Sequence, residues 1–108
     1  SYNVEVWDDT DWNKAMMVKG DIVLRKGAVL TINNNVSMAS GATIYIGKKA
    51  KLIIDGATVT NHFGYKWGGV VICKSYERKM KSPKKKEKKG ELILKNGGKL
   101  LLHCSNRQ

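Results

Sequence analysis

One apolar pattern recurs along the chain at a fixed spacing. Leu30 and Ile32 are repeated 22 residues later by Leu52 and Ile54, and residues 90–102 carry the pattern again. Within each segment every second residue is aliphatic, so these side chains share one face of an extended strand. A short strand with one apolar face must stack against a neighbour, and a fixed repeat of this length predicts a coil in which each turn covers the next.

The apolar segments fall into groups of three. The first group covers residues 22–24, 28–32 and 36–38, the second 44–46, 50–54 and the surroundings of Val59, and the third 70–72, 90–94 and 100–102. The sequence therefore predicts an all-β fold, a short single-stranded right-handed parallel β-helix of about three to four turns. We expect residues 1–19 to form an N-terminal partial turn or cap, residues 20–104 the repeats, and residues 105–108 a tail.

The third group is stretched by two insertions. Leu52 and Leu92 are 40 residues apart, and insertions of four residues before Val70 and fourteen before Gly90 account for the whole excess over 22. Repeat folds tolerate insertions at their turns, because the strands on either side keep their neighbours. The longer insertion is expected to be a mobile basic loop at residues 74–89, and the shorter one, around Tyr65 and Trp67, a bulged corner.

The basic loop dominates the charge of the chain. The formal net charge is +11, and residues 74–89 hold nine of the twenty basic residues against two acidic ones. Such a segment attracts polyanions, unless it serves only as a solvated loop. The polyanion-binding candidates are Arg78, Lys79, Lys81, Lys84, Lys85, Lys86, Lys88 and Lys89. Because Tyr76 is the only aromatic residue in this segment, sequence-specific binding of nucleic acid is not expected.

Both ends of a stacked coil leave strand edges and apolar side chains to be covered. Trp7 and Trp12 are candidates at the front. The rear is followed by few residues, so we expect it to be covered by further chain or to associate with another copy. No apolar stretch reaches the roughly 20 residues that span a bilayer, so no transmembrane segment is predicted.

Few residues suggest catalysis, a metal or a cofactor, and none of the three is predicted. The acidic residues of the repeats form no pair of the kind that glycoside hydrolysis needs, and Asp8, Asp9 and Asp11 fit a turn or a helix cap better than a calcium loop. The histidines and cysteines do not have the spacing of a zinc site. Cys73 and Cys104 leave one disulfide open, and geometry decides whether it forms.

Several strings carry a resemblance to a known group of proteins. They are residues 41–46 (GATIYI), 50–61 (AKLIIDGATVTN) and 67–70 (WGGV). Over residues 12–104 the chain resembles the right-handed parallel β-helix domains of secreted or surface-anchored bacterial proteins. That group includes adhesins, glycan-binding surface proteins and polysaccharide-degrading enzymes, so the resemblance implies architecture more than activity.

We expect a non-catalytic, secreted or cell-surface module for structural display or adhesion. Glycans are its expected ligands, and aromatic rings on an exposed face are the expected contacts: Tyr45, Tyr65 and Trp67. Two alternatives stay open. One is a polyanion-binding module that acts through the lysine-rich loop, and the other is a fragment of a polysaccharide-degrading enzyme.

Overall fold

A computed structural model describes residues 2–62, 64–73 and 88–102 of the chain. These residues form twelve strands and no helix. The strands are β1 (Val4–Val6), β2 (Thr10–Trp12), β3 (Met16–Val18), β4 (Ile22–Leu24), β5 (Val29–Ile32), β6 (Val36–Met38), β7 (Thr43–Ile46), β8 (Lys51–Asp55), β9 (Thr58–Asn61), β10 (Gly69–Ile72), β11 (Glu91–Lys95) and β12 (Lys99–Leu100).

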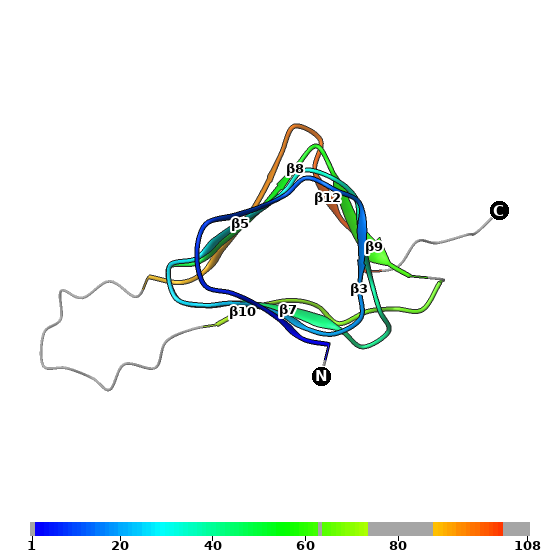
Figure 1. Cartoon of the computed structure of the whole chain (residues 1–108), viewed down its shortest axis with the longest axis horizontal. Coiled ribbons are helices and arrows are strands. Elements are labelled where there is room, and N and C mark those ends of the chain that lie inside the picture. Colours follow the sequence, from blue (N-terminus) through cyan, green and yellow to red (C-terminus); the bar gives the residue numbers. More distant parts are fainter. Residues whose placement is uncertain (1, 63, 74–87, 103–108) are drawn as a thin grey trace, which may run out of the picture.

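The strands build three parallel sheets that the chain visits in rotation. Sheet A has the order β1-β4-β7-β10, sheet B β2-β5-β8-β11 and sheet C β3-β6-β9-β12, and every pairing is parallel. Seen along the stack, the three sheets form the sides of a triangle (Figure 1). The predicted parallel β-helix is confirmed. We call its successive sets of three strands coil 1 (β1–β3), coil 2 (β4–β6), coil 3 (β7–β9) and coil 4 (β10–β12).

The register follows the aliphatic repeat. Leu30 pairs with Leu52, and Leu52 pairs with Leu92, so one column of leucines passes through three coils of sheet B. In sheet A, Ile44 lies between Ile22 and Val70. Both insertions lie between strands, one between β9 and β10 and the other between β10 and β11. The repeats therefore keep their register across both insertions, as the spacing predicts.

The N-terminal segment is more complete than a partial turn. Residues 4–18 give one strand to each sheet, and these strands pair with β4, β5 and β6. Trp12 is half-buried and packs against the core, as expected of a residue at the front of the stack. Trp7 is exposed and instead lies beneath the guanidinium of Arg25, which is 4.8 Å from the ring centre.

The core is the inside of the triangle. The inward side chains of coils 2 and 3 are fully enclosed, because each has a coil above and a coil below it. The inward side chains of coil 4 have a neighbour on one side only, and Leu94 is 48% exposed where Ile54, its partner in β8, is 0% exposed. The described part of the stack therefore has a closed middle and an open rear.

Candidate functional site: a basic corner

The chain passes from sheet A to sheet B once in every coil, and these passages lie above one another. They are residues 7–9 in coil 1, residues 25–28 in coil 2, residues 47–50 in coil 3 and, of the described residues in coil 4, 73 and 88–90. In Figure 1 this corner is the left-hand vertex of the triangle. Any residue type that recurs in these turns is consequently gathered along one edge of the molecule.

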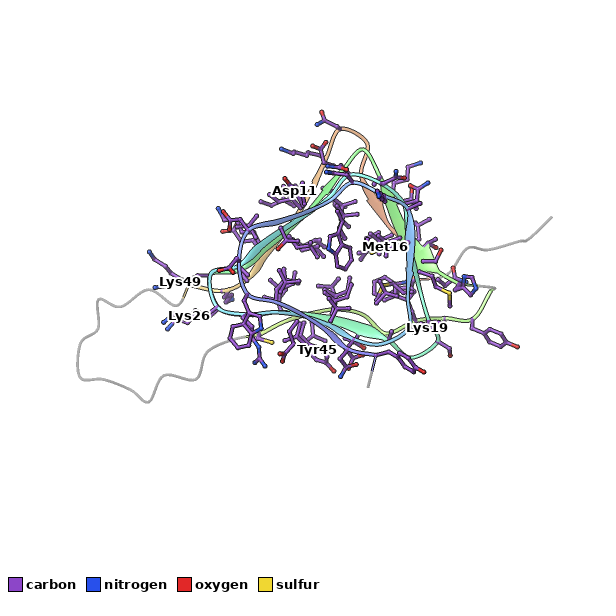
Figure 2. All side chains as sticks on the ribbon, in the orientation of Figure 1. Asp11, Met16, Lys19, Lys26, Tyr45 and Lys49 are labelled. Carbon is purple, nitrogen blue, oxygen red and sulfur yellow. The ribbon has the colours of Figure 1, made fainter. Side chains whose placement is uncertain are left out.

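Adjacent cations recur in three of the four turns. We call them the basic corner, which comprises Arg25, Lys26, Lys48, Lys49, Lys88 and Lys89. Two backbone hydrogen bonds join the turns: the Gly27 N–H donates to the Lys48 carbonyl at 3.0 Å, and the Lys49 N–H donates to the Lys88 carbonyl at 3.3 Å. Figure 2 shows Lys26 and Lys49 extending outward from this corner, away from the core. Successive turns are thus separated by about one strand spacing, roughly 4.8 Å.

The local backbone explains why the lysines point outward. Ala28 and Ala50 lie inside the coil, and their N–H groups each donate at 3.0 Å to the carbonyl three residues earlier, which closes a tight turn. The residue before each alanine has a positive φ, of 76° at Gly27 and 60° at Lys49. A left-handed conformation costs a residue with a Cβ about 1–2 kcal/mol, which glycine avoids. Lys49 therefore holds a position that glycine would fill at lower cost, and such a departure suggests a use for its charge.

The charges along the corner are not equally available. Arg25 forms an ion pair with Glu5 in coil 1 and lies over the Trp7 ring, so its charge is already compensated. Lys48 is half-buried. Lys26, Lys49, Lys88 and Lys89 are exposed and form no ion pair within the described ranges. Like charges at this spacing repel one another, so a bound polyanion would relieve that repulsion.

The basic corner contains part of the polyanion site predicted from the sequence. Lys88 and Lys89 lie in it, whereas Arg78, Lys79, Lys81, Lys84, Lys85 and Lys86 lie outside the described residues. Cys73 and Lys88, the described residues on either side of the longer insertion, both lie at this corner.

The sequence reasoning missed Lys26, Lys48 and Lys49. A signal for two of them was present, because Lys26, Lys48 and Lys88 each stand four residues before a leucine of the sheet B column. Read in the register of the repeat, these lysines form a column as regular as the leucines.

The three predicted glycan contacts do not form one surface. Tyr45 is half-buried on the outer face of sheet A, where its neighbours across the strands are Val23 and Val71. Tyr65 is 69% exposed and lies in the segment between β9 and β10. Figure 2 places Tyr45 on the lower side of the triangle, away from the basic corner.

The prediction for Trp67 needs correction. Its side chain belongs to the core and is 1% exposed, so no ring face is available to a sugar. Its Nε1–H donates to the Leu101 carbonyl at 2.6 Å, and its backbone N–H donates to the Leu102 carbonyl at 3.4 Å. The indole therefore packs inside the stack and ties the shorter insertion to the end of coil 4.

The carboxylates of the repeats support the fold. Asp21 accepts a hydrogen bond from the Thr43 N–H at 2.9 Å, and Asp55 accepts one from the Asn96 side chain at 2.6 Å. Across the residues that the structure describes, no three His, Cys, Asp or Glu side chains are grouped so as to hold a metal ion. The sequence leaves open a disulfide between Cys73 and Cys104, and Cys104 lies outside the described residues.

Comparison with known proteins assigns neither a family nor a function to the chain. No family model matches the chain, and no curated protein or solved structure matches it either. Within the described ranges there is no helix long and apolar enough to cross a membrane. A function must therefore be inferred from the basic corner itself.

Proposed function

We propose that this protein is a non-catalytic binding module that holds polyanionic chains, in particular acidic or sulfated glycans, along its basic corner. The observation that carries the proposal is the stacking of cation pairs from three successive coils on one edge of a rigid scaffold. The pairs of coils 2 and 3 are each held by a strand on either side, and the Lys88–Lys89 pair is followed directly by β11. Little backbone freedom of the first two pairs is therefore lost when a ligand binds.

The shape of the corner favours a linear ligand. Coils 2 to 4 place their turns about 5 Å apart, so the cations extend over roughly 10 Å parallel to the stack axis. An extended polyanion carries charges at intervals along its length and can contact all three turns at once. The lysine-rich insertion is joined to the described chain at this same corner, through Cys73 and Lys88, and its lysines would add to the contact.

The proposal includes a place of action. On the strength of the family resemblance, we assign the module to a secreted or surface-anchored bacterial protein in which it serves display or adhesion. Tyr45 and Tyr65 remain secondary contacts for sugar rings in this proposal, and Trp67 is withdrawn because it is buried.

Heparin binding at several salt concentrations tests the corner. The test variant is Lys26→Gln/Lys49→Gln/Lys89→Gln, and its matched control is Lys14→Gln/Lys66→Gln/Lys99→Gln, which removes three exposed lysines outside the corner. By the counterion-release relation for nucleic acids, the slope of log K against log salt should fall by about 2 to 3 in the test variant. The control should stay close to the unchanged protein. Equal losses in the two variants would overturn the proposal, because net charge alone would then account for binding.

Two further measurements distinguish the corner from the insertion, and glycans from nucleic acid. Replacing the insertion lysines Lys79, Lys81, Lys84, Lys85 and Lys86 by Gln should weaken heparin binding without removing the effect of the corner triple variant. If the insertion variant alone lost binding and the corner variant bound normally, the corner would not be the site. Single-stranded DNA is the competing ligand, and tighter binding of DNA than of heparin at equal salt would refute the assignment to glycans.

A further inference from the structure

Both ends of the described stack expose core-type side chains. At the rear, Ile72, Leu94 and Leu102 are 43%, 48% and 42% exposed. At the front, coil 1 has an apolar hollow of about 260 Å³, lined by Tyr2, Val4, Trp12, Met16, Met17, Val18 and Lys19. Exposed apolar surface at two opposite faces is unfavourable for an isolated molecule, and it commonly marks an interaction surface.

The strands at these ends also have free edges. Among the strands that the structure describes, β10, β11 and β12 each pair with one neighbour, and so do β1, β2 and β3. A free edge presents unpaired N–H and C=O groups to which another strand can add. Because every pairing in the stack is parallel, the rear edges and the front edges have the same direction and can continue one another.

Charge distinguishes the two ends and selects an orientation. In coil 1, residues 2–20 carry four acidic and two basic side chains, a net charge of −2. In coil 4, residues 69–73 and 88–102 carry one acidic and four basic side chains, a net charge of +3. Front-to-front and rear-to-rear contacts would oppose like charges, whereas a front-to-rear contact brings opposite charges together.

We propose that copies of this chain stack end to end, with coil 4 of one copy against coil 1 of the next. Continuing the register of the sheets sets Val4 of one copy beside Val70 of the other, and Thr10 beside Leu92. The same arrangement brings Asp8 and Asp9 to the corner that holds Lys88 and Lys89. A front-to-rear contact does not close on itself, so it produces linear oligomers whose length rises with concentration.

Sedimentation velocity over a range of protein concentrations tests the assembly. The unchanged protein should shift from monomer towards longer species as its concentration rises. The variants Asp8→Lys/Asp9→Lys and Lys88→Glu/Lys89→Glu should each need at least a tenfold higher protein concentration to associate, because each gives both ends of the stack a net charge of the same sign. An equimolar mixture of the two variants should associate again, because their unlike ends then match. Circular dichroism melts of each variant would establish that the exposed substitutions leave the fold intact.

If the unchanged protein stays monomeric at every concentration, the proposal is overturned. Something other than a second copy would then cover the open rear. A mixture of the two variants that stays monomeric, although the unchanged protein associates, would overturn the front-to-rear orientation. The variant Leu94→Arg puts a charge on the rear alone and should also abolish association. Asp8→Lys/Asp9→Lys leaves all six cations of the basic corner in place and adds two lysines to the coil 1 turn at the same corner. This variant should therefore lose association while it keeps heparin binding, which separates the two proposals.

Discussion

Leu52→Ala should lower the free energy of unfolding strongly, because it removes side-chain volume from the closed middle of the stack. Leu52 is 0% exposed and lies between Leu30 and Leu92 in the sheet B column. The substitution removes three buried carbon atoms, which lowers the free energy of unfolding by roughly 2.5 kcal/mol through lost apolar burial. The unfilled space that it leaves between two neighbouring coils raises the loss to about 3–5 kcal/mol. The matched control is Leu94→Ala, the same change at an inward position of coil 4. Leu94 is 48% exposed and borders no enclosed space, so its loss should be about 1 kcal/mol.

Equilibrium unfolding in urea measures both losses from the shift in midpoint. Coincident transitions by fluorescence and circular dichroism should be established first, because stacked repeats can unfold in stages. The protein should be dilute enough to be monomeric, since association would bury Leu94. If Leu52→Ala does not fold, Ile54→Val is the milder probe of the closed middle, with an expected loss of about 1 kcal/mol. Equal losses at positions 52 and 94 in monomeric protein would refute the distinction between a closed middle and an open rear.

Two further substitutions test details of the stack. Trp67→Phe removes the hydrogen bond to the Leu101 carbonyl and should lower the free energy of unfolding by about 1–2 kcal/mol while heparin binding is retained, measured by urea unfolding and by heparin affinity. A loss of binding with unchanged stability would restore Trp67 as a contact residue. Gly98→Ala would drive a Cβ into the Ile54 carbonyl and should cost about 1–3 kcal/mol by the same unfolding assay, more than Gly97→Ala, where a positive φ is the only strain. The reverse order would contradict the close approach of the two coils at this point.

The sequence was enough to predict the stack because the physical signal is repeated. Leu30, Leu52 and Leu92 are inward residues at equivalent positions, and both insertions fall where a turn tolerates them. Coil 1 was harder to recognise because its turns are shorter. Val4 stands 18 residues before its partner Ile22, and Thr10 stands 20 before Leu30, so neither follows the spacing of 22.

The site was predictable only in part. A run of lysines is visible in the sequence. Lys26, Lys48 and Lys88, in contrast, are recognised as neighbours only when the repeats are aligned in register. The misplacement of Trp67 has a different cause. An aromatic residue within an insertion normally suggests an exposed loop, but this one is held by the carbonyl of Leu101, 34 residues away. No local pattern could reveal that contact.

Nuclear magnetic resonance couplings across hydrogen bonds give the most direct test of the stacked corner on which the functional proposal depends. Such couplings identify donor and acceptor pairs residue by residue. The structure predicts one from the Gly27 amide to the Lys48 carbonyl and one from the Gly47 amide to the Leu24 carbonyl. Together with the bond from the Lys49 amide to the Lys88 carbonyl, they place the lysine turns one above another. Couplings that instead link these amides in an antiparallel pattern would contradict the coil, and with it the basic corner.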